Sequence, residues 1–301
     1  MGANTKRADA KRTVGILICA VICLISAAEW GKTRMQAARE ADTVAQLAEL
    51  TRKTQDFPGD KDRITKKMDQ AENEENAANE EIRGQKLAAQ KADHESRDYA
   101  RLAEKNSDFE GWIWIPGTAV DLPVMNDPQD PQKYLRKDFW GKTSLGGSLF
   151  LAEGCTMDSD CLLIYGHNMR NGAMFGSLGR YRKREYWQQH RWIEIYMPKE
   201  QREYEVFAVF QTTVPELASA TETDAADLKN GFPYYRYAGN FDQGEFQAFV
   251  GEICRRACYD TGIVPEFGEQ ILLLSTCSYH AKDGRLVVAA KSAAVCATSE
   301  Q

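Results

Sequence analysis

The stretch LLLSTCSYHAKDGRLVVAAK, residues 272–291, consists of two apolar runs separated by a short polar loop. Runs of this kind, bounded by turn residues, predict two strands joined as a hairpin. Cys277 ends the first run and Arg285 opens the second. A cysteine that only fills a core needs no arginine beside it, whereas a thiolate nucleophile requires a cationic neighbourhood or a histidine partner. The hairpin therefore predicts a site of thiol chemistry as well as a strand pair.

Short β-rich runs recur through the chain before this hairpin. With the hairpin they give eight candidate strands, residues 112–115, 119–125, 147–152, 161–166, 191–197, 204–214, 271–277 and 285–291. Strands and helices do not alternate, so the pattern predicts a mainly β fold, a barrel or a sandwich. Between Val214 and Gln270 the residues Phe246, Phe249 and Ile253 recur with helical spacing, which predicts one amphipathic helix within 244–260.

The N-terminus has the features of a membrane anchor. Four basic residues precede the run 13–30, which contains no charge until Glu29. Its length is close to the lower limit of the ~17–25 residues that cross a bilayer as a helix. The basic flank predicts a cytoplasmic tip, with everything after residue 31 outside the cell. A cleaved signal peptide is the alternative, because Ser26-Ala27-Ala28 resembles a cleavage site.

Residues 32–108 are rich in Ala, Glu, Gln, Lys and Asp, and no heptad pattern is sustained. This composition predicts a charged, solvated helical stalk, interrupted by FPGD at 57–60. A catalytic domain is expected to follow at 109–296. Because the stalk has few apolar residues, we expect a protein that begins near Asn106 to fold without it. The net charge of −6 argues against a nucleic-acid partner.

The eight cysteines do not form a metal-binding pattern. Cys254 and Cys258 are four residues apart on the predicted helix, and we interpret them as helix packing. Cys155 and Cys161 flank a short loop and are open either to a disulfide outside the cell or to remaining free thiols. No CxxC pair or cluster of His and Cys ligands is present, so we expect neither a metal nor a cofactor.

Four histidines are available as partners for Cys277. His94 lies in the stalk, His190 at the polar end of a short helix and His280 in the loop of the hairpin. His167 ends the run CLLIYGHNM, so it too stands where a strand ends. Side chains at the ends of different strands converge at the rim of a barrel. We therefore predict that His167 is the partner of Cys277.

These motifs resemble those of a known family. LSTCSYHAKDGRLVVAAK is similar to the cysteine–arginine signature of the sortases, and IYGHNM to their histidine motif. DFEGWIWIPGT with DLPVM, the segment YLRKDFWGKTSLGGSLFL and the helix before the last strand pair resemble class B sortases. The resemblance covers residues 105–292. One departure is Leu273, where the family pattern has a threonine.

The resemblance implies a sortase-type, eight-stranded β-barrel with peripheral helices, preceded by a transmembrane helix and a helical stalk. It also implies transpeptidation at the surface of a Gram-positive cell. In this chemistry Cys277 forms a thioester with the substrate and His167 transfers protons. Arg285 donates hydrogen bonds to the developing oxyanion or to the substrate backbone. The same resemblance suggests four substrate-binding residues, Leu135, Ser275, Thr276 and Tyr279.

The expected partners follow from that chemistry. The donor is an exported protein or pilin with a C-terminal sorting signal, which in class B relatives often follows the pattern NP-x-T-x. The acceptor is an amine of peptidoglycan, of its lipid-linked precursor or of a pilin lysine. The enzyme is expected in the cell membrane with its catalytic domain outside. Two alternatives stay open: a secreted cysteine endopeptidase that only hydrolyses its substrate, and a membrane-tethered scaffold with an inert barrel.

Overall fold

The computed structural model of the chain describes residues 31, 34–35, 38–52, 75–214 and 231–293. The predicted membrane anchor, residues 13–30, and the break at 57–60 lie outside these ranges. Among the described helices, none has the length and apolarity to span a bilayer. The chain divides into two units, Met1–Ala45 and Gln46–Gln301. The described residues of the first unit are helical, and all the strands belong to the second.

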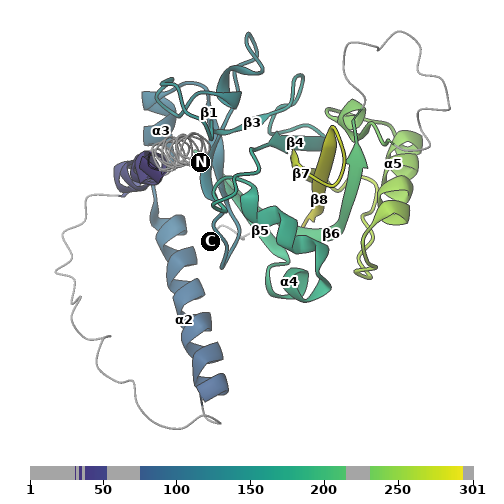
Figure 1. Cartoon of the computed structure of the whole chain (residues 1–301), viewed down its shortest axis with the longest axis horizontal. Coiled ribbons are helices and arrows are strands. Elements are labelled where there is room, and N and C mark those ends of the chain that lie inside the picture. The colour runs from purple at the N-terminus through teal and green to yellow at the C-terminus, as the bar shows by residue number, and fades with distance from the viewer. Residues whose placement is uncertain (1–30, 32–33, 36–37, 53–74, 215–230, 294–301) are drawn as a thin grey trace, which may run out of the picture. The chain divides into compact units, whose positions relative to one another are not determined.

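The eight predicted strands are all present, and they close into a barrel (Figure 1). The order around the barrel is β1-β2-β3-β4-β7-β8-β6-β5. The strands are β1 (Phe109–Trp114), β2 (Asp121–Met125), β3 (Leu149–Leu151), β4 (Cys161–Tyr165), β5 (Trp192–Tyr196), β6 (Gln201–Thr213), β7 (Ile271–Cys277) and β8 (Gly284–Ser292). The sequence left a barrel and a sandwich open, and the pairing of β1 with β5 closes the barrel.

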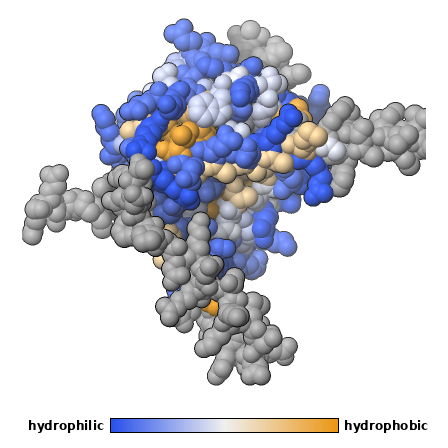
Figure 2. Space-filling model, turned by 90° about the vertical axis from the view of Figure 1, so that its left-hand side faces the viewer, coloured by the Kyte–Doolittle hydropathy of each residue, from blue (hydrophilic) through white to orange (hydrophobic). Residues whose placement is uncertain are grey.

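The two central strands β4 and β7 run parallel to each other, whereas most other pairs are antiparallel. Strands that are covered on both faces read as continuous apolar runs rather than as alternating patterns. This explains the runs CLLI in β4 and ILLL in β7, in which every residue is buried. The surface in Figure 2 is mainly hydrophilic, with apolar side chains limited to a smaller area.

Helices cover the outside of the barrel. Among the described residues from 100 onward, the helical elements are α3 (Ala100–Lys105), η1 (Lys133–Leu135), η2 (Gly176–Arg182), α4 (Arg184–Gln189), η5 (Tyr234–Tyr237) and α5 (Gln243–Arg256). The predicted amphipathic helix is confirmed as α5, which lies alongside β6 (Figure 1). It begins with a capping box between Asp242 and Glu245, which satisfies backbone N–H groups at its first turn.

The cysteines of this region were interpreted wrongly. The buried face of α5 consists of Phe246, Phe249, Val250 and Ile253, whereas Cys254 is exposed. Cys258 lies beyond the end of the helix and is exposed as well. Neither cysteine therefore belongs to the buried face of the helix. The prediction took the helix to continue to residue 260, which would have placed the two cysteines on one face. The helix ends at Arg256, before Cys258.

The end of the stalk packs on the barrel, which the sequence did not predict. Tyr99, just before α3, is 4% exposed, and Leu102, within α3, is 0% exposed. The last two turns of α2 (Glu75–Ser96) carry His94, which is 2% exposed and stacks on Tyr196 of β5 at 5.0 Å between ring centroids. Residues 91–105 therefore contribute to the packed structure and are not the solvated stalk that the sequence predicted. The sequence concealed this contact because most of its members, such as Tyr99, His94 and Lys91, are polar or aromatic.

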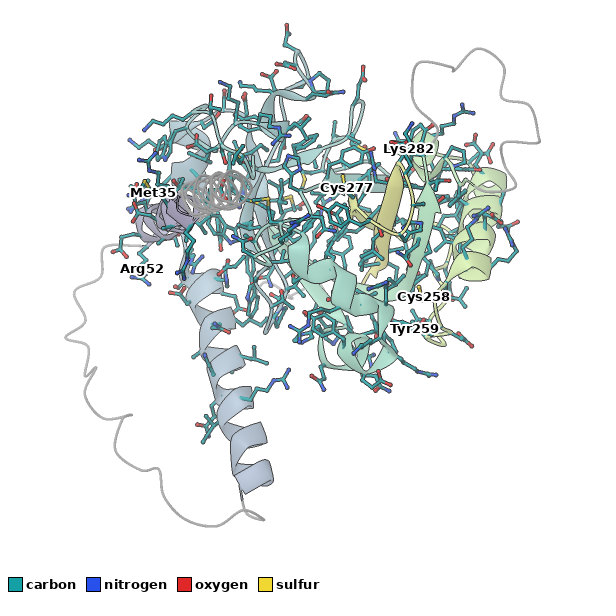
Figure 3. The ribbon with its side chains drawn as sticks, in the orientation of Figure 1. Met35, Arg52, Cys258, Tyr259, Cys277 and Lys282 are labelled. Atoms are coloured by element: carbon teal, nitrogen blue, oxygen red, sulfur yellow. The ribbon has the colours of Figure 1, made fainter. Side chains whose placement is uncertain are left out.

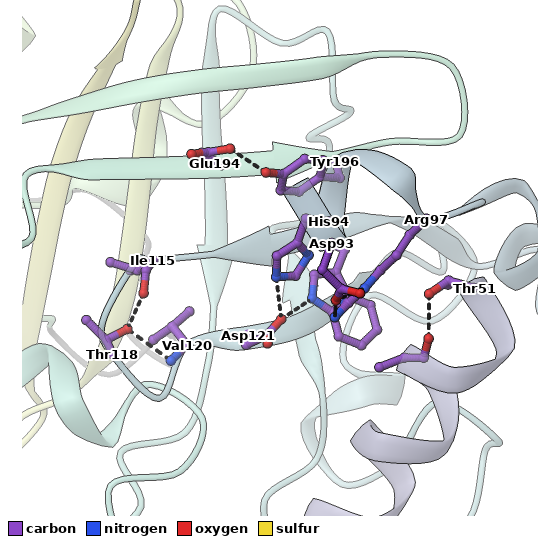
Figure 4. A network of polar contacts seen from close by, with 12 residues as sticks. Thr51, Asp93, His94, Arg97, Ile115, Thr118, Val120, Asp121, Glu194 and Tyr196 are labelled. Atoms are coloured by element: carbon purple, nitrogen blue, oxygen red, sulfur yellow. Dashed lines mark hydrogen bonds and ion pairs between the residues drawn. The ribbon is translucent and has the colours of Figure 1, made fainter. Parts of the chain in front are cut away.

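A polar network fixes this contact (Figure 4). The Nε2 of His94 lies 3.4 Å from a carboxylate oxygen of Asp121, and its Nδ1 lies 2.8 Å from the hydroxyl of Tyr99. Because a carboxylate only accepts, Nε2 carries the proton and Nδ1 accepts from Tyr99. Nearby, Lys91 of α2 lies 3.0 Å from the buried carboxylate of Glu194 in β5. The helix thus neutralises a charge that the barrel buries.

Removing this helical end is expected to destabilise the barrel, which replaces the expectation from sequence. A protein that begins at Asn106 loses the burial of Leu102 and leaves Glu194 without Lys91. Loss of a buried leucine and of one partner of a buried ion pair together lower the free energy of unfolding by at least ~3 kcal/mol. Urea unfolding of proteins beginning at Glu75 and at Asn106 measures the difference. Equal stability of the two would show that the contact contributes nothing.

The stability of the fold is expected to decrease in mild acid. Burial lowers the pKa of the His94 imidazole from 6.5 to about 4. An unfolded histidine therefore binds its proton near pH 6.5, while folded His94 stays neutral until about pH 4. Between these values the unfolded state holds more protons, so the free energy of unfolding falls as the pH decreases, by up to ~3 kcal/mol.

Urea unfolding of the native protein and of His94→Gln at pH 7.5, 6 and 5 measures this effect. Burial also lowers the pKa of His190, but His190 titrates in both proteins and cancels in the comparison. We expect the native protein to lose more stability than His94→Gln as the pH decreases. Parallel pH profiles for the two proteins would contradict the assignment.

Candidate active site

Cys277 and Arg285 are directly paired across the last hairpin. Cys277 is the final residue of β7, and its register partner in β8 is Arg285. Side chains of directly opposed residues in an antiparallel pair extend from the same face of the sheet. The thiol and the guanidinium therefore share one face at the end of the hairpin. Cys277 is exposed there, at the start of the loop that also carries Lys282 (Figure 3).

His167 reaches the same rim through the parallel pairing of β4 with β7. Tyr165 is the register partner of Ser275, and Gly166 donates its N–H to the Ser275 carbonyl at 3.1 Å. In a parallel pair both chains leave the sheet at the same edge, with the strands roughly 4.8 Å apart. His167 and Cys277 each stand two residues beyond this pair. The parallel register thus brings together two residues that are far apart in the sequence.

The chain after His167 is tied to the end of β7. The side-chain amide of Asn168 donates to the Cys277 carbonyl at 2.7 Å, and Phe175 donates its N–H to the His167 carbonyl at 3.0 Å. Gly166 is required at the turn, because a Cβ there would lie 2.5 Å from Leu149 and 2.6 Å from the ring of Phe175. These contacts fix the backbone from which both predicted catalytic side chains extend.

The His167 ring is held by a backbone carbonyl. Its Nε2 lies 2.9 Å from the carbonyl oxygen of Leu135, which ends η1. A carbonyl oxygen only accepts, so Nε2 carries the proton in this contact. In the part of the chain that the structure describes, no protein group bonds Nδ1. The nitrogen that remains available for proton exchange is therefore Nδ1.

Arg285 has no carboxylate partner among the described residues. It is half-buried, and its Nη1 donates to the carbonyl of Gly284 at 3.1 Å. Asp283 is the nearest carboxylate in the sequence, and no ion pair between it and Arg285 is present in the described part of the chain. Four of its five N–H donors are thus left without a protein acceptor there. A guanidinium in this state is able to bind a carbonyl or oxyanion.

Two buried hydroxyls stand behind Cys277. Ser275, on the same face two residues earlier, is 0% exposed and lies 2.6 Å from the hydroxyl of Tyr234 in η5. Burial raises the pKa of Tyr234 to about 12, so its hydroxyl keeps its proton at neutral pH. Burial also raises the pKa of Tyr165, while the charge of Arg285 opposes that rise. Tyr165 and Tyr234 thus lie near the predicted site.

The predicted substrate-binding residues occupy different environments. Tyr279 is 74% exposed in the hairpin loop, and Leu135 is half-buried beside His167. Ser275 and Thr276 are buried, and the Thr276 hydroxyl lacks a hydrogen-bond partner. Their contact with a substrate stays a prediction. The side chains of Ser275 and Thr276 are buried in this structure and are not accessible to a substrate.

Three neighbours of the site were not singled out from the sequence: Asn168, Tyr165 and Tyr234. Asn168 and Tyr165 flank His167 in the motif IYGHNM, so their proximity to the histidine was a usable signal. Tyr234 lies in the long connection between β6 and β7, within FPYYRY. That segment has neither strand nor helix periodicity, so nothing in the sequence directs it to the end of β7.

The buried thiols of the described chain lie outside this arrangement. Cys155 and Cys161 are free thiols, both buried, and the sulfur of Cys155 lies 3.4 Å from the Cys161 carbonyl. Burial raises the pKa of both thiols, which opposes formation of a reactive thiolate. Among the described residues no group of three or more His, Cys, Asp or Glu side chains is placed to hold a metal ion.

Comparison with known proteins agrees with this geometry. The sequence model of the sortase domain matches residues 113–293. Sortase B of Listeria monocytogenes is 28% identical over 204 residues, covering 65% of this chain and 75% of that protein. Sortase B of Staphylococcus aureus is 27% identical over 212 residues, covering 69% and 79%. The crystal structure of Bacillus anthracis sortase B in complex with AAEK1 is 30% identical, with a TM-score of 0.53, and covers 65% and 84%.

The closed barrel, together with the match of the sortase domain to residues 113–293 of this chain, places the chain in the sortase family of cysteine transpeptidases. Within the family it belongs to class B, as the relatives in Listeria, Staphylococcus and Bacillus show. The expectation drawn from the hairpin and histidine motifs is therefore confirmed at the level of fold and family.

Proposed function

We propose that this protein is a membrane-anchored transpeptidase that joins exported proteins to a cell-surface amine through a thioester on Cys277. The observation that carries the proposal is the register at one rim of the barrel. Cys277 is paired directly with Arg285. His167 and Cys277 each follow by two residues the last parallel pair of β4 and β7, Tyr165 with Ser275. A nucleophile, a proton carrier and a cationic donor thus meet at one edge, which supports acyl transfer.

The reaction uses these groups in two steps. The thiol of Cys277 gives its proton to Nδ1 of His167, its sulfur attacks the carbonyl carbon of the scissile bond and forms a C–S bond, and the electron pair moves to the carbonyl oxygen. When the tetrahedral intermediate collapses, the C–N bond breaks and His167 donates a proton to the leaving amine. An incoming amine then attacks the thioester and gives its proton to His167. Cys277 leaves as a thiolate, and a new amide bond is complete.

Arg285 is proposed to stabilise the oxygen that becomes negative in both steps. Its unpaired N–H groups extend from the same face as the thiol. A charged donor aimed at a developing oxyanion contributes on the order of 3–4 kcal/mol to lowering the barrier. The alternative role, holding the substrate backbone, uses the same donors but contributes to binding of the ground state as well.

The substrate and location follow from the family and from the N-terminal sequence. The proposed donor is a protein with a C-terminal sorting signal of the NP-x-T-x type, and the proposed acceptor is a peptidoglycan, lipid-linked or pilin amine. The uncharged run 13–30 with its basic flank supports anchoring in the cell membrane with the barrel outside. A solved structure of Staphylococcus aureus sortase B, 24% identical to this chain when the two structures are aligned, is of a complex with substrate.

Incubating the protein with a fluorogenic NP-x-T-x peptide and triglycine tests the function. A transpeptidase yields the peptide fragment joined to triglycine by an amide bond, which mass spectrometry identifies. A secreted endopeptidase would yield only the free carboxylate at any triglycine concentration.

Labelling with a methanethiosulfonate reagent distinguishes both kinds of enzyme from an inert scaffold. Because Cys254 and Cys258 are also exposed, its products must be mapped by peptide, with selective labelling of Cys277 expected.

A further inference from the structure

The hydrogen bond between His167 and Leu135 depends on how the Leu135 carbonyl is held. The carbonyls on both sides of it are bound to another part of the chain. The Tyr134 carbonyl accepts the N–H of Ser148 at 2.9 Å, and the Arg136 carbonyl accepts the N–H of Ser144 at 3.0 Å. The Leu135 carbonyl instead accepts from the His167 ring at 2.9 Å. The segment 144–148 thus holds the turn so that this one carbonyl is directed at His167.

Gly147 lies directly against the carbonyls of this turn. A Cβ at this position would lie 2.4 Å from the Tyr134 oxygen, 2.6 Å from the Leu135 oxygen and 2.8 Å from the Leu135 carbonyl carbon. All three contacts are with backbone atoms, so no side-chain rotation relieves them. Gly147 has a φ of 59°, in the left-handed region, and its N–H donates to the hydroxyl of Ser144 at 3.1 Å. Only glycine meets both requirements without strain.

We infer that Gly147 is a positioning residue for the catalytic histidine, an inference that rests on the proposed role of His167. Because Gly147 lacks a side chain, the Leu135 carbonyl occupies the place where it accepts from Nε2 of His167. That contact fixes the tautomer and leaves Nδ1 for proton exchange with substrate. The glycine touches neither the substrate nor the reacting atoms, and it acts through one backbone oxygen.

The chain contains a matched control for this inference. Gly141 lies in the same connection between β2 and β3 and has a φ of 73°, but a Cβ there would meet nothing within 4 Å. Gly141→Ala therefore introduces the same unfavourable backbone angle without moving the Leu135 carbonyl. A difference between Gly147→Ala and Gly141→Ala measures the close approach rather than the general cost of alanine at positive φ.

Steady-state kinetics with the NP-x-T-x peptide and triglycine give the first test, in the full chain kept in mild detergent. Misplacement of a catalytic group by about 1 Å typically costs about 10²-fold in rate. We expect Gly147→Ala to lower kcat by that order with KM little changed, and Gly141→Ala to retain the native kcat and KM. Native kcat in Gly147→Ala, or equal losses in the two variants, would overturn the inference.

Nuclear magnetic resonance gives a second test that does not depend on activity. The ¹⁵N shifts of labelled histidine report which ring nitrogen carries the proton, and the His167 signal is identified by its absence in His167→Ala. The native protein and Gly141→Ala should hold the proton on Nε2, while Gly147→Ala should show a mixture of tautomers. An unchanged tautomer in Gly147→Ala would overturn the inference. If the native protein joins no peptide to triglycine, the proposed function fails, and the tautomers still decide the role of Gly147.

A milder variant keeps the test decisive if Gly147→Ala does not fold. Ser144→Ala removes the hydroxyl that accepts the Gly147 N–H, without adding a clash. We expect a smaller decrease in kcat and a partial loss of the Nε2 tautomer. Native kcat and a native tautomer in a folded Ser144→Ala protein would overturn the inference that residues 144–148 position the Leu135 carbonyl.

Discussion

Cys277→Ala is expected to abolish acyl-enzyme formation and to reduce peptide cleavage to background, a loss on the order of 10⁴-fold or more. Alanine offers no atom that attacks a carbonyl, and the other exposed thiols of the described residues, Cys254 and Cys258, lie outside the paired strand ends. Mass spectrometry of the protein after mixing with an NP-x-T-x peptide measures the acyl-enzyme directly. An acyl adduct on Cys277→Ala would contradict the mechanism.

His167→Ala is expected to fall to a similar level, because the proposed mechanism takes the proton for the leaving amine from His167. His280 provides the matched control. It lies three residues after Cys277 but is exposed, and its Nδ1 is bound to the hydroxyl of Ser278 at 2.8 Å. His280→Ala should therefore keep most of the native activity. If His280→Ala is as inactive as His167→Ala, the proton carrier has been assigned to the wrong histidine or is shared.

Strand positions were predictable from the sequence because each strand has its own local signature. Runs such as CLLIY and ILLL are apolar throughout, and polar or turn residues follow them. The closure of the barrel was not predictable, because it depends on β1 pairing with β5, and β2, β3 and β4 lie between these two strands in the sequence. The packing of the stalk was missed for a different reason. His94 and Lys91 are polar, and only the burial of His94 itself and of Glu194, the partner of Lys91, shows that they are part of its packing.

For the candidate site, the sequence was informative where chemistry and strand ends coincide. Cys277 and Arg285 belong to one hairpin, so their pairing follows from a local turn. His167 required the further assumption that its strand reaches the same rim, which the parallel pairing of β4 with β7 satisfies. The Leu135 carbonyl had no signal at all. A backbone oxygen has the same chemistry in every residue, and only the fold determines which one is directed at the histidine.

Arg285 is the remaining member of the site, and its substitution separates charge from geometry. The guanidinium is planar and presents several donors in fixed directions, whereas a lysine ammonium is a compact charge. If Arg285 stabilises the oxyanion, Arg285→Lys should lower the rate of acylation with little change in peptide affinity. Arg285→Ala should lower it further, by about 10²–10³-fold, as expected for loss of one oxyanion donor.

Pre-steady-state acylation of both variants, followed by mass spectrometry, measures these rates, and thermal melts of the same samples test folding. Arg285 bonds only the Gly284 carbonyl within the described chain, so neither substitution should lower the melting temperature appreciably. A native rate of acylation in Arg285→Ala would return this residue to an ordinary strand arginine. A weaker apparent peptide affinity with an unchanged maximal rate would instead assign its donors to the substrate backbone. Because Arg285 faces the same side of the hairpin as Cys277, a loss confined to acylation is the result that the pairing of the two residues predicts.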